Sequence, residues 1–482
     1  MNVDSIRANA PSRAARSVAV MAACELLGKG ATLVFTVSAA RALGPSGFGA
    51  FSYAVTFGLL LATLPSWGFD NVMLRRASAD PTSLQAALAQ ALVCRALIAV
   101  PVLVIGGAAG AASQVSGPAR TAVVLILAAS LLESMGDAGR AAEAARERTG
   151  STSIALLLQR LATTGLALTV LVWGGHLEGV CVAYLVSSVL GLALTALALR
   201  RLDVRPDWGK VNRPSLVRMR QESFYIGLNT LVAMALFRVD AVILHQLKGN
   251  MALAQYAVAY RLLETVLFLN WVVSRALFPS MARESSDARQ VLLIVERGLA
   301  VLGAAFVPYA VFLLLEGESV LRLLFGTEYL QDSTLILRWL AFAPLTFGLT
   351  FLVGYALLAR NLNREVLLAS AVGAVFNIGA NMLLIPRFSG VGAAFTTTAS
   401  YLLSAAMMLW FVRDGGRLRV ERALALPVAA AVPLIVALVL LRLPVMLEAL
   451  AVAPVYCSSY LLLAYWRDRQ QLVVLRSMVR RA

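Results

Sequence analysis

Residues 85–107 read QAALAQALVCRALIAVPVLVIGG, an apolar stretch interrupted by a single charge, Arg95, near its middle. A helix that crosses the hydrocarbon core of a bilayer needs about 20 apolar residues, so this stretch predicts a membrane span. A guanidinium at the bilayer centre costs at least about 2.5 kcal/mol. Arg95 is therefore expected to face protein or water, either for function or in an ion pair.

Similar stretches fill most of the chain, which has 482 residues, 60% of them hydrophobic and 14% charged, and a mean hydropathy of +0.78. A typical soluble domain has about 25% charged residues. The composition predicts an all-α polytopic membrane protein. Fourteen transmembrane helices are expected, at 18–42, 47–67, 85–107, 119–139, 152–174, 178–199, 223–247, 252–279, 291–315, 334–359, 365–385, 391–412, 423–441 and 445–466.

Lys and Arg alternate strongly between the connections on the two sides of these spans. With the N-terminus inside, the cytoplasmic connections hold 28 of the 42 basic residues and the outer ones hold 6. Cytoplasmic loops are enriched in Lys and Arg, so both termini are predicted to be cytoplasmic. This topology explains most of the formal net charge of +16, and the dispersal of the charges over short loops argues against nucleic-acid binding.

The longest polar stretch divides the predicted spans into groups. We expect an N-terminal six-helix lobe, a basic cytoplasmic linker, a C-terminal six-helix lobe, and a further helix pair with a cytoplasmic tail, at 1–199, 200–221, 222–413 and 414–482. The second span opens with FGAFSYAVTF (48–57) and the eighth with LAQYAVAYRL (253–262). Copies with an even number of spans keep the same orientation, so these segments indicate two parallel repeats.

Eight basic residues fall within predicted spans, and four of them are candidates for binding an anion: Arg95, Arg160, Arg238 and Arg261. Arginine suits this task because its planar fork binds phosphate through two hydrogen bonds. The alternative is structural pairing, with Glu133, Asp137 or Asp240 as partners on other helices. Arg261 also has Glu264 three positions on, and Lys29 has Glu25 four positions before it.

Acidic residues within the spans could couple transport to an ion gradient. The sequence contains no phosphate-binding GxxxxGK loop, so ATP hydrolysis by this chain is not expected. Asp240 is the first candidate for a coupling carboxylate, and Glu25, Glu133 and Glu264 are second choices; the alternative is that they balance neighbouring charges. Asn377 and Asn381 could line a path for a glycan, although adhesion between helices is favoured. No cofactor, metal site or catalytic residue is expected.

Several motifs resemble those of one transporter family. RALGPSGFGAFSYA (41–54) and GFDNVMLRRAS (68–78) are similar to its opening signature. FRVDAVIL (237–244) and FSGVGAAFTTTASY (388–401) follow in the order that the family shows. The family is the polysaccharide transporter group, the Wzx-type flippases of O-antigen and exopolysaccharide repeat units, and the resemblance covers nearly the whole chain.

The resemblance implies the fold of the multidrug, oligosaccharidyl-lipid and polysaccharide exporter superfamily, with two six-helix lobes around a central cavity. It also implies a lipid-linked oligosaccharide substrate carried on undecaprenyl pyrophosphate, alternating access, and the bacterial cytoplasmic membrane. Membrane lipids, a polysaccharide polymerase and a chain-length regulator are the partners it suggests. A multidrug extruder and a lipid II exporter of the same fold stay open as alternatives, as does the choice between O-antigen, capsule and exopolysaccharide. A membrane enzyme is disfavoured because the longest predicted outer loop, 316–333, is short.

Overall fold

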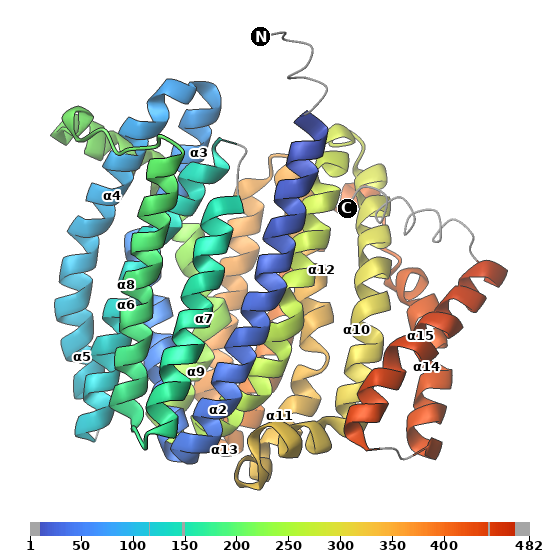
Figure 1. Cartoon of the computed structure of the whole chain (residues 1–482). Helices are drawn as coiled ribbons and strands as arrows, with labels where there is room; N and C mark the ends of the chain where they lie inside the picture. Colours follow the sequence, from blue (N-terminus) through green and yellow to red (C-terminus); the bar gives the residue numbers. More distant parts are fainter. Residues whose placement is uncertain (1–9, 115, 147–149, 442–443, 468–482) are drawn as a thin grey trace. The chain divides into compact units, whose positions relative to one another are not determined.

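The computed structural model describes residues 10–114, 116–146, 150–441 and 444–467, and every regular element within these ranges is helical (Figure 1). The predicted cytoplasmic tail and both chain ends lie outside the described residues. The chain forms two compact units, the first reaching Val242 and the second beginning at Ile243.

The first unit contains α2 to α8 and the first part of α9. Its helices are α2 (Ala10–Ser66), α3 (Phe69–Ala79), α4 (Leu84–Pro101), the π-helical turn η2 (Val102–Gly106), α5 (Gly107–Ala112), α6 (Gly117–Ala144), α7 (Gly150–Val172), α8 (Leu177–Arg201) and α9 (Arg213–Arg283), with short 3-10 turns η1 (Pro81–Ser83) and η3 (Trp208–Lys210).

The second unit contains the rest of α9 and the helices that follow. These are α10 (Ala288–Phe325), α11 (Leu330–Leu340), α12 (Ala343–Ala359), α13 (Asn363–Phe411), α14 (Val420–Leu441) and α15 (Val445–Arg467), with 3-10 turns η4 (Thr327–Tyr329) and η5 (Arg413–Gly415).

Eleven helical segments in the described ranges are long and apolar enough to cross a membrane. Three of them are broken by a residue with a positive φ: Gly44 at 64°, Gly249 at 78° and Ser389 at 50°. Each of these residues falls between two predicted spans, so each of the three segments crosses twice and the fourteen predicted spans are confirmed. Glycine takes a positive φ at little cost, whereas Ser389 carries strain of the order of 1–3 kcal/mol.

The region before α12 differs from the prediction. The first half of the predicted outer loop 316–333 is helical, because α10 runs without interruption to Phe325 and ends before Gly326, at φ 94°. The predicted span 334–359 is divided into α11 and α12 by a turn at 341–342. In Figure 1, α11 lies crosswise to α10 and α12.

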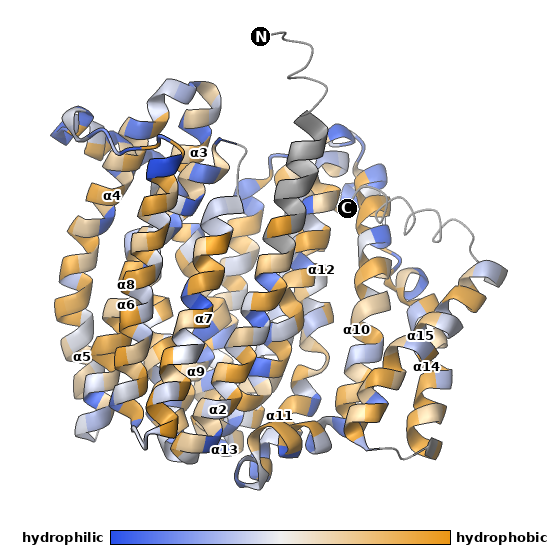
Figure 2. Ribbon diagram, in the orientation of Figure 1, coloured by the Kyte–Doolittle hydropathy of each residue, from blue (hydrophilic) through white to orange (hydrophobic). Residues whose placement is uncertain are grey.

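Each unit has its own apolar core. In the first unit, Val72, Met73 and Leu88 pack together where α3 meets α4. In the second, Leu302 and Phe306 of α10 pack in a larger cluster with α12 and α13. Figure 2 shows apolar residues along most of each helix, with isolated hydrophilic positions inside α2 and α7. Further interior polar positions, on α4 and α6, belong to the candidate site.

Candidate functional site: a polar network in the first unit

A break in the second span positions the first carboxylate of the network. Trp67 and Gly68 both have positive φ, 34° and 71°, and α3 begins immediately afterwards at Phe69. A Cβ on Gly68 would lie 2.9 Å from the Cβ of Ile226 in α9, so the backbones approach closely here. This close approach and the positive φ both require glycine. The break places Asp70 in the first turn of α3.

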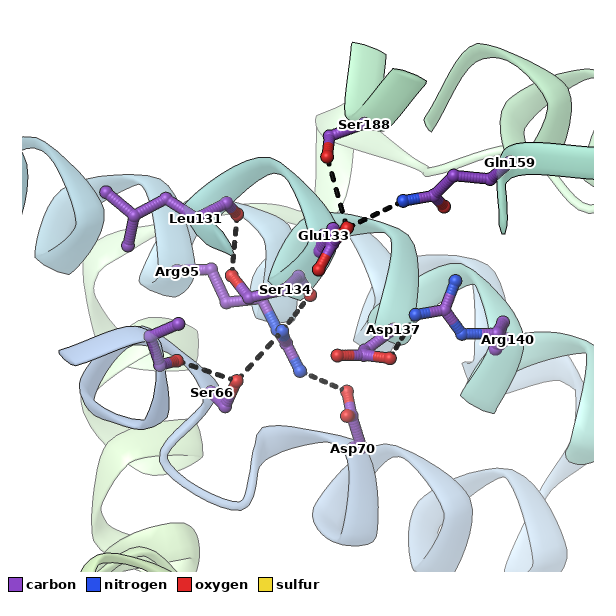
Figure 3. A network of polar contacts seen from close by, with 11 residues as sticks. Ser66, Asp70, Arg95, Leu131, Glu133, Ser134, Asp137, Arg140, Gln159 and Ser188 are labelled. Carbon is purple, nitrogen blue, oxygen red and sulfur yellow. Dashed lines mark hydrogen bonds and ion pairs between the residues drawn. The ribbon is translucent and has the colours of Figure 1, made fainter. Parts of the chain in front are cut away.

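Arg95 of α4 is fully buried and joins three parts of the first unit (Figure 3). Its Nη2 donates to the Asp70 carboxylate at 2.6 Å. Its Nη1 donates to the backbone carbonyl of Ser134 in α6 and contacts the Ser66 hydroxyl at 3.4 Å. Arg95 therefore faces protein, as predicted, but its partner is Asp70 rather than Glu133, Asp137 or Asp240.

Glu133 lies one residue before Ser134 on α6 and contacts two other helices. Its Oε1 accepts a hydrogen bond from Nε2 of Gln159 in α7 at 2.7 Å and another from the hydroxyl of Ser188 in α8 at 3.1 Å. Gly191 makes room for this arrangement, because a Cβ there would overlap the Gln159 side chain. Both of these hydrogen-bond donors to Glu133 are neutral groups.

The network holds more acidic than basic side chains. Asp137 lies one turn from Glu133 on α6, where it pairs with Arg140 and is within electrostatic range of Asp70 (Figure 3). Three carboxyls, those of Asp70, Glu133 and Asp137, thus accompany two guanidiniums, those of Arg95 and Arg140. A single added proton would make this set of five groups neutral.

Arg160 of α7 forms a separate ion pair with Glu25 of α2, with Nη1 and Oε2 2.8 Å apart. The two side chains keep 27% and 42% of their surface exposed. Close by, the Thr164 hydroxyl donates to the carbonyl of Ala31, which also joins α7 to α2. The sequence suggested Lys29 as the partner of Glu25, and this contact between helices was not predicted.

The remaining candidates lie on α9. Asp240 is buried, and its carboxylate accepts a hydrogen bond from the backbone N–H of Ala241 at 2.7 Å. The Arg238 guanidinium lies 4.7 Å from the centre of the Phe237 ring. Arg238 and Asp240 both belong to the first unit.

Arg261 and Glu264 belong to the second unit and pair with each other at 3.0 Å, as their spacing of three residues predicted. Both side chains are partly exposed. The predicted residues are thus divided: the network contains Arg95 and Glu133, while Arg160 with Glu25 and Arg261 with Glu264 form two further pairs.

Buried amides of the second unit make contacts between helices. The Asn377 amide donates to the Ser400 hydroxyl at 3.1 Å, and the Asn381 amide donates to the Asn377 side-chain oxygen at 2.9 Å. Asn270 of α9 donates to the carbonyl of Pro344 at 3.2 Å. These contacts agree with the favoured interpretation of Asn377 and Asn381 as adhesion between helices.

Several residues of the network were not among the predicted site residues, among them Asp70, Gln159 and Ser188. Asp70 lies just beyond the predicted second span, 47–67. The signal that could have identified it is Gly68, because a glycine just before an acidic residue inside an apolar stretch suggests a break that turns the acid inward.

Comparison with known proteins identifies the family of the chain. A model of the polysaccharide biosynthesis protein family matches residues 14–285. The chain belongs to this family. A model of the lipid II flippase MurJ family matches residues 152–465, and the predicted membership in the superfamily that includes both families is confirmed.

Curated relatives of this polysaccharide biosynthesis protein match over part of their length. The probable flippase AglR of Haloferax volcanii is 27% identical over 199 residues, which cover 40% of this chain and 42% of the relative. An uncharacterized membrane protein of Methanocaldococcus jannaschii, MJ1068, is 26% identical over 199 residues, covering 39% and 38%. The chain therefore matches about two fifths of the length of these relatives.

Solved structures show the same fold at low identity. The lipid II flippase MurJ in an inward closed conformation aligns with a TM-score of 0.76 at 11% identity, covering 93% of this chain and 99% of that one. An inward-facing multidrug transporter of the MATE family aligns with a TM-score of 0.63 at 14% identity, covering 82% and 94%. The predicted fold class is confirmed: a multi-pass helical membrane protein of this superfamily.

Proposed function

We propose that the chain is a flippase that moves undecaprenyl pyrophosphate-linked oligosaccharide repeat units across the bacterial cytoplasmic membrane by alternating access. The observation that carries this proposal is that guanidiniums lie inside the apolar spans of a member of the polysaccharide biosynthesis family. The headgroup must cross about 30 Å of hydrocarbon, where an anionic pyrophosphate needs cationic partners. The names of relatives such as the probable flippase AglR support the same activity.

The four predicted arginines receive different roles in this proposal. Arg160 and Arg261 are partly exposed, and each is held by one carboxylate that a phosphate can compete with. Together with Arg238 they are the proposed headgroup contacts. Arg95 has no exposed surface, so we assign it to positioning: it holds α3 against α6 through Asp70 and the Ser134 carbonyl.

A lipid II exporter is the second candidate function. It is favoured by the match of the MurJ family model to residues 152–465. Lipid II and the proposed oligosaccharide lipid carry the same pyrophosphate chemistry, so the interior arginines serve either substrate.

Translocation in proteoliposomes distinguishes these functions. The purified chain is reconstituted with undecaprenyl pyrophosphate-linked oligosaccharide or with lipid II, and glycan exposure is followed with an impermeant lectin. We expect the oligosaccharide lipid to be moved and Arg160→Ala to slow it, with Arg205→Ala as the control because Arg205 is an exposed linker residue. Movement of lipid II alone would select the second candidate. Efflux of a cationic dye without movement of either lipid would select a multidrug extruder.

Ion-gradient coupling is part of the proposal, with Glu133 as the coupling carboxyl. Glu25 and Glu264 each pair with an arginine, whereas the Gln159 and Ser188 donors to Glu133 are neutral. Glu133 also belongs to a network with one carboxyl in excess. Binding and release of one proton at Glu133 would change the charge of this set of five groups between zero and minus one.

The coupling test uses an imposed pH gradient. Glu133→Gln keeps an oxygen for the Gln159 and Ser188 hydrogen bonds but cannot ionise. We expect this variant to bind the lipid substrate and to lose its response to the gradient, while Asp240→Asn responds like the parent. A full response in Glu133→Gln would refute its role, and loss in Asp240→Asn alone would assign coupling to Asp240.

The proposed orientation has both termini in the cytoplasm. A polysaccharide polymerase and a chain-length regulator are the proposed partners on the same pathway. Reporter fusions after Asp207 are expected to be cytoplasmic, and fusions at Gly326 external. An external fusion after Asp207, or a cytoplasmic fusion at Gly326, would contradict the proposed orientation.

A further inference from the structure

Three arginines of the first unit share a single carboxylate, that of Glu222. Arg75 and Arg76 approach it from α3, at 3.0 Å and 3.2 Å, and Arg218 approaches it from one turn earlier in α9, at 3.0 Å. We call Arg75, Arg76, Arg218 and Glu222 the arginine cluster. One negative charge among three positive charges leaves a net charge of plus two.

A buried amide, that of Gln90, holds one arginine of the cluster in place. Gln90 of α4 is 7% exposed and accepts a hydrogen bond from Nη1 of Arg76 at 2.9 Å. The Gln90 amide in turn contacts the carbonyl of Lys210 at 3.4 Å. Positive-inside topology needs only the charge of an arginine, so it does not explain why Arg76 is held in a fixed pose. Nη2 of Arg76 is buried and lies 3.2 Å from Oε1 of Glu222, in an ion pair without hydrogen-bond geometry.

Aromatic side chains place the cluster at the depth of lipid headgroups. Phe224 and Tyr225 follow Glu222 on α9, and both are exposed. The Phe224 ring packs against Trp67 with centroids 6.4 Å apart. Exposed aromatic residues at the end of an apolar helix mark the membrane interface, and two residues along a helix correspond to about 3 Å. The exposed guanidiniums of Arg75 and Arg218 therefore lie within reach of phosphate groups in the same leaflet.

We propose that the arginine cluster is a binding site for the phosphate of a lipid headgroup at the cytoplasmic surface of the first unit. Arg75 and Arg218, the exposed members, take the phosphate oxygens, and Arg76 is the fixed base of the site. Two sources carry this chemistry: the pyrophosphate of the transported lipid and the phosphate of an anionic phospholipid. In the first case the site captures substrate before translocation, which rests on the proposed function; in the second it anchors a resident lipid.

The ion pair between Arg360 and Asp414 is a contact in which the two charges balance. Arg360, just after α12, makes two hydrogen bonds to Asp414 at 3.0 and 2.6 Å, one to each carboxylate oxygen. One guanidinium meets one carboxylate there, so no charge is left over. Arg360→Gln is therefore the matched control for the cluster.

The test measures lipid binding to the full-length chain in detergent by native mass spectrometry. The probes are undecaprenyl pyrophosphate, phosphatidylglycerol and, as a ligand without phosphate, undecaprenol. We expect Arg75→Gln/Arg218→Gln to weaken binding of at least one phosphate lipid by roughly 25-fold, because each surface arginine contributes about fivefold. Undecaprenol binding and the Arg360→Gln variant should match the parent.

A charge change of the opposite sign gives a second test. Glu222→Gln raises the net charge of the cluster to plus three and frees the guanidiniums, so phosphate-lipid binding should become about fivefold tighter. A merely structural salt-bridge cluster would not bind more tightly when its carboxylate is removed. Unchanged affinity of the double arginine variant for both phosphate lipids would overturn the proposal.

The lipid probes distinguish the transported lipid from a resident phospholipid. Translocation assays on the same variants distinguish the proposed function from the proposed phosphate site. Weakened binding of undecaprenyl pyrophosphate alone supports substrate capture, and weakened binding of phosphatidylglycerol alone supports a resident lipid. If the parent moves no oligosaccharide lipid but still binds phosphate lipids through the cluster, the proposed function fails and this site stands. If translocation proceeds and the double arginine variant binds every probe like the parent, the proposed function stands and this site fails.

Discussion

The two units bury polar groups in different ways. In the first unit, contacts between helices include full charges, such as Arg95 with Asp70, and a carboxyl, Glu133, that contacts neutral donors. In the second unit, the buried contacts of Asn377 are between neutral amides and hydroxyls. A neutral contact keeps the same charge at every pH, whereas an acidic network can gain or lose a proton. The difference suggests that the first unit responds to ions and that the α13 contacts serve mainly cohesion.

The largest effect is expected at Arg95. Arg95→Ala removes a fully buried guanidinium and leaves the Asp70 carboxylate, which is 27% exposed, without its partner, so stability should fall by up to about 3–5 kcal/mol. Arg261→Ala breaks a partly exposed pair within one helix and should cost less than about 1 kcal/mol. Denaturation of the purified variants by SDS in mixed micelles measures both.

The companion variant is Arg95→Met with Asp70→Leu, which removes both charges and should recover most of the loss. If Arg95→Ala and Arg261→Ala cost the same, the distinction between the two units fails at its strongest point.

Two glycines allow the same substitution in each unit. A Cβ at Gly191 would overlap Gln159, and a Cβ at Gly373 would overlap the Ser404 hydroxyl. Each Gly→Ala should therefore cost about 1–3 kcal/mol through overpacking. Gly165→Ala and Gly379→Ala are the controls, since nothing lies within 4 Å of either position, and they should be neutral or gain up to about 1 kcal/mol.

The difference between the two units predicts that Gly191→Ala and Gly373→Ala also differ in how transport responds to pH. Gly191→Ala displaces a donor of Glu133, so it should also change the response of transport to pH. Gly373→Ala should lower stability without that change. The reverse pattern would place the ion-responsive contacts in the second unit.

A smaller effect is expected from removing single hydrogen bonds. Asn377→Leu should cost about 0.6 kcal/mol, and at most about 1.7, as for neutral hydrogen bonds between membrane helices. Gln159→Leu removes a bond to a carboxyl and should cost more, about 1.5–3 kcal/mol when Glu133 is ionised. Thermal unfolding at two pH values tests this, because protonation of Glu133 should reduce the difference between the two variants.

The smallest effect is expected at Arg360 and Asp414, outside the membrane spans. The hydrogen bonds from Arg360 hold the pKa of the Asp414 carboxyl below its usual range. The folded state thus binds this proton less readily, so the pair contributes stability above the ordinary carboxyl pKa of about 3.9 and loses it as the pH falls through the lowered value. The melting temperature of Arg360→Gln should be slightly below that of the parent at pH 7 and should converge with it towards pH 3. A constant gap across this range would contradict the assignment.

Span number was predictable because it depends on local properties of the chain. Bilayer thickness sets the length of each apolar stretch, and the alternation of Lys and Arg marks each turn. The positive-φ residues Gly44 and Gly249 sit where two such stretches meet. The division of 334–359 was not predictable in this way, because ILRWLAFAPLTF (336–347) is apolar except for Arg338 and Thr346, and hydropathy does not show that a turn interrupts it.

The candidate site was predictable in its residue types and not in its pairings. Placing a charge inside a span requires a partner, so Arg95 and Arg160 were identified as candidates from hydropathy alone. Their partners depend on which helix faces are adjacent and on the break at Gly68, which brings Asp70 towards Arg95. The Arg261–Glu264 pair was correct because it is local, with both residues on one helix face.

The contact between Asp70 and Arg95 also has a consequence for biogenesis. The two residues lie on consecutive spans joined by the short connection 80–83, so they emerge from the ribosome close together. A lone arginine opposes partitioning of the third span into lipid, but a hairpin that enters with its predecessor carries the neutralising carboxylate with it. Entry of the third span into the bilayer then depends on the second, and loss of Asp70 would leave a nascent chain whose third span is poorly inserted before any tertiary fold exists.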